Sequence, residues 1–508
     1  MRVLGALLLT CAAVLPLNAQ EANPLSAIDW LSESVEITAA RPAPVAPTIN
    51  EPPASTAAGV PQVTVRPLDA PSPDPVGLIP SDVSGLPQSL WAKSDSQTLV
   101  TLMQNERVDT LPGVHDLMMT LLLAEADPPL GAGADGALFL ARVDKLLDLG
   151  ALDPALALLG QVDQQSPDLF RRWFDVALLT GDEGLACDVM QETPSVAPTY
   201  PARIFCMARN GDWSAAALTL NTHRVLGDVT QEEEALISRF LDPELYEDEP
   251  LLPAPSRLSP LVFRMREAIG QALPTTRLPN AFAHSDLRNT TGWKSQLEAA
   301  ERLARIGAIS ENVLHGKYSA RKPAASGGVW DRASAVQRLD RALASDDSDA
   351  TSTALVAAWN AMQSVKLEVP FARLYADQLA PLDLSPAAAA VAYNIALLSA
   401  NYETAAQDHP AQDFLSLLAQ GIPSGARTSK EQAIQAAFDD AMPSAELEAL
   451  ARNGMLGEAL LESIYVFNDG FAGDLRSLTD ALAFWRFVGL EDVARKVALQ
   501  AMLLERKT

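Results

Sequence analysis

Three segments of the chain share one pattern, in which a helix ends at a glycine, an acidic residue follows, and an Ala/Leu-rich helix begins. Glycine ends a helix because its backbone adopts the left-handed conformation, and aspartate caps the free amides of the next helix. The glycines recur at intervals of about 30 residues, a period typical of an α-solenoid of TPR-like helix-turn-helix repeats. The segments are LDLGALDPALALL (147–159), LLTGDEGLACDVM (178–190) and MARNGDWSAAALTL (207–220), with Gly150, Gly181 and Gly211.

Looser copies of the pattern continue along the chain, at 304–314, 398–407, 451–461 and 486–499. The alternative is that a glycine followed by an acid simply marks any helical hairpin. Alternating runs of β-branched residues are nearly absent, while Ala and Leu are abundant. From residue 88 onward we therefore expect an all-α fold, organised as an α-solenoid.

The first residues, 1–19, are typical of a cleaved signal peptide. Arg2 precedes an apolar run at residues 3–14, and Ala19 offers a small residue at the cleavage position. The run is too short for a membrane anchor, which needs about 20 apolar residues. Cys11 leaves lipidation open as a second alternative. We expect an exported, periplasmic protein with no membrane span in the mature chain, or alternatively an extracellular one.

A short amphipathic helix is predicted at residues 20–38, just after the signal. Asn23 is a good N-cap and Pro24 fits the first helical position. So short a helix is not stable alone in water, so it needs a surface on its own solenoid or on a partner protein. The third alternative is disorder. Its docking face would consist of Leu25, Ile28, Trp30, Leu31 and Val35.

Composition divides the rest of the chain. Residues 39–87 are rich in Pro and Ala and are predicted to form a disordered tether, because they cannot bury enough apolar surface to fold alone. A Pro-rich acidic stretch near 241–258 and a break near 421–431 suggest two further boundaries. The predicted units are a helical-repeat block at 88–244, a middle helical block at 245–420 with an irregular loop at 315–334, and C-terminal helical hairpins at 421–508.

Cleavage of the signal would leave two cysteines, Cys187 and Cys206. They lie in two predicted helices joined by the turn TPSVAPT, at similar distances from its midpoint. Antiparallel packing of the helices would bring the two sulfur atoms to the same level. Export to an oxidising compartment then favours a disulfide between them; the alternative is two buried free thiols.

Several classes of function find no support in the residues. A net charge of −26 would repel nucleic acid and anionic membranes. The five histidines are far apart in the sequence, and metal-binding, hydrolase and phosphate-loop motifs are missing. We therefore expect no catalytic residue, no metal and no cofactor. The acidity favours solubility, with capture of a cationic partner as the alternative.

The densest cationic cluster of the chain lies in HGKYSARKPAASGGVWDRAS (315–334). Such a loop could bind an anionic or glycan ligand through ion pairs and stacking. The alternative is a structural crossover whose arginines pair with nearby acids and whose tryptophan packs inward. His284, Arg288 and Trp293 could line the same surface. The candidate residues are His315, Lys317, Tyr318, Arg321, Lys322, Trp330 and Arg332.

Two resemblances add to these observations. The predicted shape is similar to the helical portion of soluble lytic transglycosylases, but Glu33 and Glu462 lack the motifs around that family's catalytic glutamate. The segments SAIDWLS, GLPQSLW, ARKPAASGGVWDR and GLEDVAR resemble a group of uncharacterised exported helical-repeat proteins of alphaproteobacteria. Some members are loosely labelled "antifreeze glycopeptide-related", yet this chain has no Ala-Ala-Thr tracts. The resemblance implies no activity.

The sequence therefore favours a non-enzymatic periplasmic scaffold or protein-interaction module of the cell envelope, with an envelope protein or peptide as its partner. Helical-pair arrays expose an extended concave face suited to such binding. One alternative is a binder of an anionic or glycan ligand through loop 315–332. The other is a divergent peptidoglycan-acting enzyme similar to lytic transglycosylases.

Overall fold

The computed structural model describes residues 72–162, 166–345, 347–439 and 441–504. Within them every regular element is helical, from α2 to α26, and there is no β-strand, which confirms the all-α prediction. None of these helices combines the length and apolar composition needed to cross a bilayer. The predicted signal peptide and N-terminal helix lie outside the described residues, and so do Leu25, Ile28, Trp30, Leu31 and Val35.

The three glycines of the recurring pattern end helices as predicted. Gly150, Gly181 and Gly211 have left-handed φ angles of 78°, 95° and 88°. They follow α5 (Ala137–Leu149), α7 (Pro167–Thr180) and α9 (Tyr200–Arg209), respectively. In the looser copies, Gly307, Gly454 and Gly489 are also left-handed. These helix ends are therefore set by local backbone chemistry.

The aspartates of the pattern behave less uniformly. Asp212 caps α10 (Trp213–Leu226), where its side chain accepts a hydrogen bond from the amide of Ala215 at 3.1 Å. Asp182 is the N-cap of α8 (Glu183–Glu192) but its side chain accepts no capping hydrogen bond. Asp153 lies inside the first turn of α6 (Leu152–Leu159). The predicted aspartate cap thus forms at one of the three positions.

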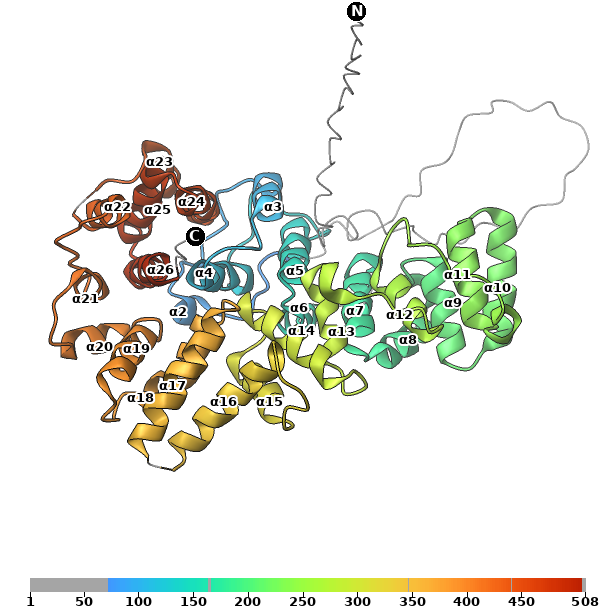
Figure 1. The fold of residues 1–508 in the computed structure, drawn as a ribbon. Helices are drawn as coiled ribbons and strands as arrows, with labels where there is room; N and C mark the ends of the chain where they lie inside the picture. The colour runs from blue at the N-terminus through green and yellow to red at the C-terminus, as the bar shows by residue number, and fades with distance from the viewer. Residues whose placement is uncertain (1–71, 163–165, 346, 440, 505–508) are drawn as a thin grey trace, which may run out of the picture.

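The first and last helices of the described chain share the largest hydrophobic core. α26 packs beside α4, and α24 packs against α3 and α4 (Figure 1). A Cβ on Gly457 would lie 2.3 Å from the ring of Trp91, so only glycine permits this close approach. α2 (Ser81–Ser84) precedes these helices and buries none of its side chains. The helices around this core are α3 (Ser96–Asn105), α4 (Pro112–Leu123), α5, α6, α20 (Tyr402–Asp408), α21 (Phe414–Ala419), α22 (Ser429–Phe438), α23 (Ala445–Arg452), α24 (Leu456–Phe471), α25 (Leu475–Phe487) and α26 (Glu491–Leu503).

This shared core differs from the division expected from composition. The blocks predicted at 88–244 and 421–508 are joined, because helices from both bury the same apolar side chains. The first block is also split, since residues from Phe170 onward build mainly a second core. Composition predicts where loops lie, but it does not predict which helices, distant in the sequence, pack against one another.

The second core belongs to a group of helices that we call the arm, which projects to the right in Figure 1. Consecutive helices of the arm pack against one another, and its last helix returns to α7. In its interior the rings of Phe170 and Phe174 are stacked, and Phe205 meets Phe174 edge to face. The arm consists of α7, α8, η1 (Pro194–Val196), α9, α10, α11 (Gln231–Leu241), η2 (Glu244–Tyr246) and α12 (Pro260–Ala268).

The predicted disulfide between Cys187 and Cys206 is confirmed. It joins α8 to α9 inside the arm, with the two Cα atoms 4.9 Å apart, and both cysteines are buried. The bond closes a loop that contains η1 and the turn between the helices. It therefore restrains the connection between α8 and α9.

Removal of this disulfide should destabilise the arm. The double variant Cys187→Ala/Cys206→Ala is expected to lose about 3 kcal/mol of unfolding free energy, because the unfolded chain regains the freedom that the closed loop removes. Urea denaturation followed by fluorescence measures the change. Addition of a thiol reductant should lower the stability of the unmodified protein by a similar amount and leave the double variant unchanged. Equal stability of all samples would contradict the expectation.

A third group of helices, with its own core, lies between the arm and the C-terminal hairpins in the chain. Trp359, Phe371 and Tyr375 pack together in its core. Its helices run from the centre of Figure 1 to the lower left, coloured from yellow-green to orange. They are η3 (Thr275–Arg277), η4 (Asn280–Ala283), α13 (His284–Leu287), α14 (Trp293–Arg305), α15 (Glu311–Ser319), α16 (Val329–Leu343), α17 (Ser348–Gln363), α18 (Glu368–Leu379) and α19 (Pro386–Leu397).

Residues 72–87, which the composition assigned to the tether, pack against the helical body. The Asp74 side chain is buried and accepts a hydrogen bond from the Phe139 amide at 2.8 Å. The guanidinium of Arg142 donates to the backbone carbonyls of Asp74 and Val76, and of two residues at the end of α4. The amides of Leu78 and Ile79 donate to the Leu123 carbonyl and hold the same segment against α4. The buried arginine satisfies the carbonyls that these backbone bonds leave free.

Candidate functional site

The predicted cationic loop does not gather its residues around one pocket. Tyr318 and Arg332 both bind the buried carboxylate of Glu301 on α14. The Tyr318 hydroxyl donates at 2.7 Å, and the Arg332 guanidinium donates two hydrogen bonds at 2.7 and 2.6 Å. Burial and the Glu301 charge raise the pKa of Tyr318 well above its ordinary value. The geometry is that of a structural crossover tied down by an acid on a neighbouring helix.

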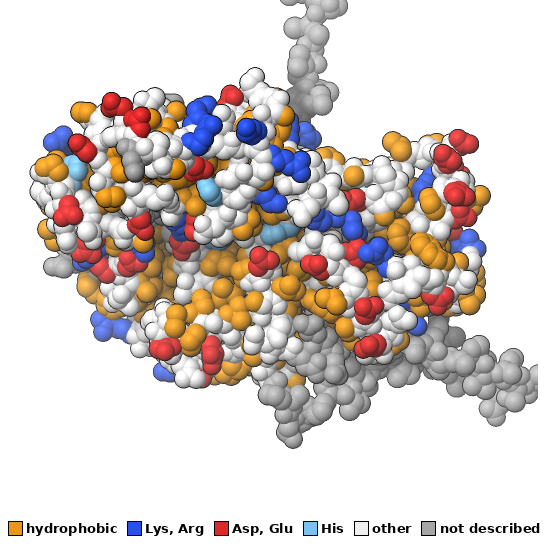
Figure 2. All heavy atoms as spheres, turned by 90° about the horizontal axis from the view of Figure 1, so that it is seen from below, with side chains coloured by type: hydrophobic (Ala, Val, Ile, Leu, Met, Phe, Trp, Pro, Cys, Tyr) orange, Lys and Arg blue, Asp and Glu red, His pale blue; other side chains and the backbone are white. Residues whose placement is uncertain are grey.

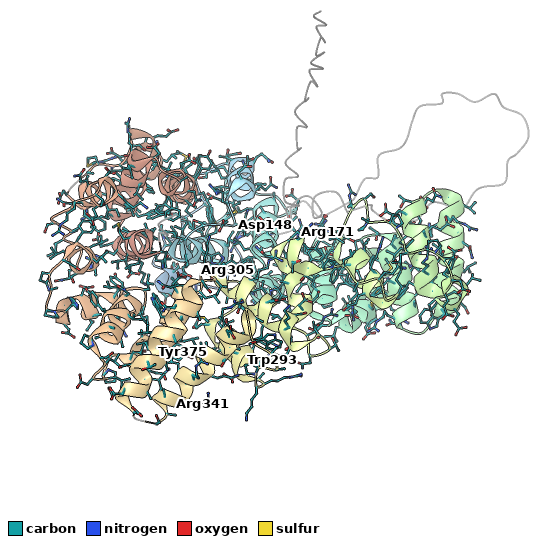
Figure 3. The ribbon with its side chains drawn as sticks, in the orientation of Figure 1. Asp148, Arg171, Trp293, Arg305, Arg341 and Tyr375 are labelled. Atoms are coloured by element: carbon teal, nitrogen blue, oxygen red, sulfur yellow. A yellow bond between two sulfur atoms is a disulfide. The ribbon has the colours of Figure 1, made fainter. Side chains whose placement is uncertain are left out.

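His315, Lys317 and Trp330 are also held by neighbours. His315 Nε2 lies 3.1 Å from a carboxylate oxygen of Asp340, and this hydrogen bond is the main reason why its pKa is raised. Lys317 donates to the Leu287 carbonyl at 2.9 Å. The Trp330 ring packs against that of Trp293, which Figure 3 labels in the lower part of the fold.

Arg321 and Lys322, by contrast, are exposed in the loop between α15 and α16. Of the upstream candidates, His284 is buried and its Nε2 lies 2.7 Å from the Gly150 carbonyl. The Trp293 indole donates to the Lys317 carbonyl at 2.9 Å. The remaining upstream candidate, Arg288, lines a different cavity.

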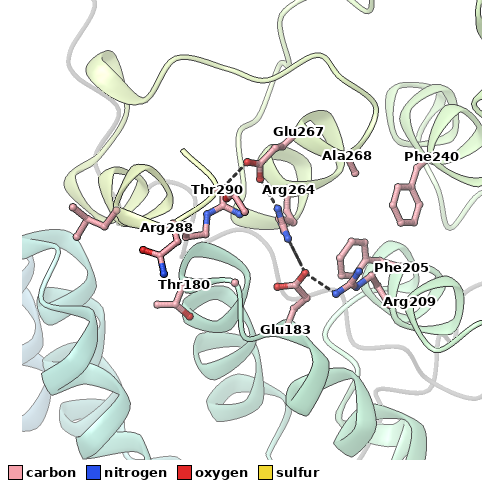
Figure 4. A pocket seen from close by; sticks show the side chains of 13 residues that line it. Thr180, Glu183, Phe205, Arg209, Phe240, Arg264, Glu267, Ala268, Arg288 and Thr290 are labelled. Carbon is pink, nitrogen blue, oxygen red and sulfur yellow. Dashed lines mark hydrogen bonds and ion pairs between the residues drawn. The ribbon is translucent and has the colours of Figure 1, made fainter. Parts of the chain in front are cut away.

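That cavity lies where the arm meets α13, and we call it the junction cavity (Figure 4). Its volume is about 700 Å³. The rings of Phe205 and Phe240, stacked at 5.4 Å, form one wall. It is lined by Thr180, Gly181, Glu183, Phe205, Arg209, Phe240, Arg264, Glu267, Ala268, Leu287, Arg288, Asn289 and Thr290.

Five charged side chains form an alternating row along the junction cavity, as the dashed lines in Figure 4 show. Glu183 Oε1 lies 3.2 Å from Arg209 and 3.0 Å from Arg264. Arg264 continues to Glu267 at 2.5 Å, and Glu267 binds Arg288 at 2.6 Å. Three arginines thus face two glutamates, so the row carries a net positive charge in a strongly acidic protein.

The two glutamates differ in how well their oxygens are satisfied. Both oxygens of Glu267 accept hydrogen bonds from arginine. Burial opposes its ionisation, but the bonds from Arg288 and Arg264 outweigh this and lower its pKa. The Glu183 side chain is only 1% exposed, and its Oε2 atom has no hydrogen-bond partner. A buried carboxylate oxygen without a partner is unusual and is a place where a ligand can donate.

Sequence reasoning identified only Arg288 among these five residues. The others come from α8, α9 and α12, which meet only after the arm folds. Local spacing offered one signal, the i,i+3 pair Arg264 and Glu267 on α12. A single i,i+3 pair is common on exposed helices, so it does not mark a cavity by itself.

Comparisons with known proteins add no further assignment, since no family model, curated protein or solved structure matches the chain. Among the described residues, no group of three or more His, Cys, Asp or Glu side chains is arranged to hold a metal ion. The junction cavity must therefore be interpreted from its own geometry.

Proposed function

We propose that the protein is a non-enzymatic helical-repeat scaffold of the cell envelope, which binds a peptide segment of another protein in the junction cavity. The proposal includes a TPR-like solenoid organisation of the helices and export through cleavage of the signal peptide at residues 1–19. The periplasm is the proposed location, and the disulfide Cys187–Cys206 is compatible with such an oxidising compartment.

The observation that carries this proposal is the unpartnered Oε2 atom of Glu183 beside three arginines. Glu183 Oε2 can accept a hydrogen bond from an N–H group, and the arginines can donate to a carbonyl or carboxylate. A peptide presents both kinds of group within a few ångströms of each other. Phe205 and Phe240 add an apolar wall for a side chain.

The surface outside the cavity supports the same proposal. Figure 2 shows a broad area of hydrophobic side chains on the face seen from below. Several large hydrophobic side chains of the arm are also exposed, among them Leu185, Leu218 and Val225 at 69%, 69% and 80%. A broad apolar area such as that in Figure 2 is typical of protein interaction sites.

The junction cavity does not favour the glycan-cleaving alternative. Glycosidases of the usual type need a carboxylic acid whose pKa is raised, so that it can protonate the leaving group. The pKa of Glu267 is lowered instead, and Glu183 is held by two arginines. Ser463, next to Glu462, is buried and accepts a hydrogen bond from Trp485 at 2.8 Å.

The proposal predicts that filling the junction cavity abolishes peptide binding. Ala268 lines the cavity with an exposed side chain, so Ala268→Trp should block it without breaking an ion pair. Peptides selected on the unmodified protein from a random display library should bind the variant at least about tenfold more weakly, measured by fluorescence anisotropy. Ala217→Trp, at an exposed position of α10 outside the cavity, is the matched control and should bind normally.

Two outcomes would contradict the proposed function. One is that the selected peptides bind the Ala268→Trp variant as tightly as the unmodified protein. The other is that the library yields no peptide whose binding saturates. Circular dichroism of both tryptophan variants checks that the helices are intact.

A further inference from the structure

A second cavity lies at the centre of the fold, and we call it the central groove. It consists of two adjoining hollows of about 440 and 580 Å³, which share Asp109, Arg305, Ile306 and Lys366 in their walls. The walls come from the segment between α3 and α4, the end of α14, the turn between α17 and α18, and helices α22 and α24. Figure 3 labels Arg305 at this central position.

Positive charge dominates the central groove, although the whole chain has a net charge of −26. Two carboxylates, Asp109 and Glu368, line the groove with five cations. In the described part of the chain, Arg107, Arg305 and Lys366 form no ion pair with a carboxylate; Arg305 instead donates to the Val365 carbonyl at 2.7 Å. The five cations are Arg107, Arg302, Arg305, Lys366 and Lys430.

Arg302 and Arg305 lie close enough to oppose each other. The Arg302 guanidinium donates to the carbonyl of Thr275 at 2.8 Å and to the Asn280 side chain at 3.1 Å, so its direct partners are uncharged. Burial, together with the charge of Arg305, lowers the pKa of Arg302. Positive charge is therefore concentrated here with less compensation than in the junction cavity.

Asn468 gives an independent indication of a ligand. It lines the groove from α24 and is only 6% exposed. Its Oδ1 atom accepts a hydrogen bond from the Thr110 hydroxyl at 2.6 Å, whereas its Nδ2 atom is buried without a partner. An amide N–H₂ group buried in this way needs an acceptor.

Lys366 also lines the groove, and its backbone is left-handed. Its φ angle of 59° makes it the only residue other than glycine with a positive φ among the described residues. This conformation belongs to the turn that ends α17, where the Lys366 amide donates to the Gln363 carbonyl and the Leu367 amide donates to the Met362 carbonyl. Glycine usually takes this position, so a lysine side chain is placed in the groove wall at a cost in backbone energy.

We propose that the central groove binds a small, multiply charged oxyanion, with phosphate or carboxylate groups held by Arg107, Arg305 and Lys366 and by the free amide of Asn468. Arginine forks bind either group through two parallel hydrogen bonds, and lysine adds a compact charge. Ile306 and Phe471 in the same walls allow the anion to carry an apolar portion.

Isothermal titration calorimetry at constant ionic strength tests this site on the full chain. Pyrophosphate and citrate are the probes, and they distinguish a phosphate ligand from a polycarboxylate ligand. We expect saturable binding of one of them, weakened about tenfold by Arg107→Gln or by Lys366→Gly. The Lys366→Gly variant should keep or raise the melting temperature, because glycine accepts the left-handed backbone.

Lys322→Gln is the matched control, since it removes one exposed charge outside the groove. Its affinity for the probe should equal that of the unmodified protein. The proposal is overturned if neither probe binds saturably, or if Lys322→Gln weakens binding as much as the groove variants. It is also overturned if only a chain ending at Leu504 binds the probe, because the occupant of the groove in the full chain would then be its own C-terminus. Failure of this site would leave peptide binding in the junction cavity untouched.

Discussion

Replacement of Arg142 by methionine should lower the free energy of unfolding by about 5 kcal/mol. The Arg142 side chain is fully buried and donates four hydrogen bonds to backbone carbonyls. Two of these carbonyls, on Asp74 and Val76, belong to the extended segment at the start of the described chain, at 3.2 and 2.7 Å. The other two, on Leu122 and Ala124, end α4, at 2.7 and 2.9 Å.

Methionine matches the length of the arginine stem but leaves these carbonyls in an apolar environment without donors. Each buried carbonyl that loses its partner costs about 1 to 3 kcal/mol, offset in part by local relaxation. Burial of the guanidinium, only partly compensated by Asp74, lowers the pKa of Arg142 to about 10. Burial of the arginine therefore costs free energy. The side chain is retained because it satisfies four carbonyls where residues 74–79 lie along the end of α4.

Urea denaturation measures the loss, and limited proteolysis should show cleavage within residues 72–79 before the helices unfold. Arg338→Met is the matched control, because Arg338 is exposed on α16 and donates only to Ser334 on its own helix. Its stability should stay within about 0.5 kcal/mol of the unmodified protein. A similar small change for Arg142→Met would contradict the assigned role.

The second large effect concerns pH. Glu106 is 6% exposed, and burial raises the pKa of its carboxyl to about 8, although Lys145 nearby opposes the shift. The folded state therefore keeps a proton at Glu106 that the unfolded chain releases near its ordinary pKa of 4.5. Stability contributed by this group is fully present below pH 4.5 and is lost as pH rises toward 8.

Glu106→Gln should remove this loss, since the amide is neutral at every pH. The variant should match the unmodified protein near pH 4.5 and exceed its unfolding free energy above pH 8 by an amount on the order of 4 kcal/mol. Denaturation curves at several pH values measure the difference. Glu192→Gln, at an exposed end of α8, should show no such pH-dependent difference.

The comparison between variant and unmodified protein matters because other buried groups titrate in the same range. Burial raises the pKa of Asp175 to about 7, so its contribution to the stability of the fold is also lost as pH rises. His115 acts in the opposite direction: burial lowers its pKa to about 4, so its contribution is lost as pH falls below 6.5. Only the difference in unfolding free energy between Glu106→Gln and the unmodified protein reports on the Glu106 carboxyl alone. A Glu106→Gln variant with the same pH profile as the unmodified protein would show that folding leaves the pKa of this carboxyl unchanged, and would contradict the prediction.

Local features of this fold could be predicted from the sequence, because their causes lie within a few residues. Gly150, Gly181 and Gly211 end helices for reasons of backbone conformation, and a Pro-containing turn between two helices placed Cys187 and Cys206 opposite each other. The all-α class followed from composition in the same way. None of these predictions required knowledge of distant contacts.

Features that depend on distant partners could not be predicted. The sequence left open whether the cationic loop is a ligand site or a structural crossover, because Glu301, the acid that neutralises Arg332 and orients Tyr318, lies on another helix. Nothing in the composition distinguishes the fully buried Arg142 from an exposed arginine. The charged row of the junction cavity likewise requires the packing of α12 against α7, which joins residues from opposite ends of the arm.

The shared core of the first and last helices has a consequence for the order in which the protein can be completed. The amide of Gly113 in α4 donates to the Gln500 side chain of α26, 387 residues away along the chain. During synthesis, α3 and α4 are made long before α24 and α26. Until then their apolar faces stay exposed to water or bound to a chaperone. The arm has its own core and a local disulfide, so it can bury its apolar side chains before the C-terminal helices are made. A chain without α26 would therefore expose the apolar side chains of α4 to water.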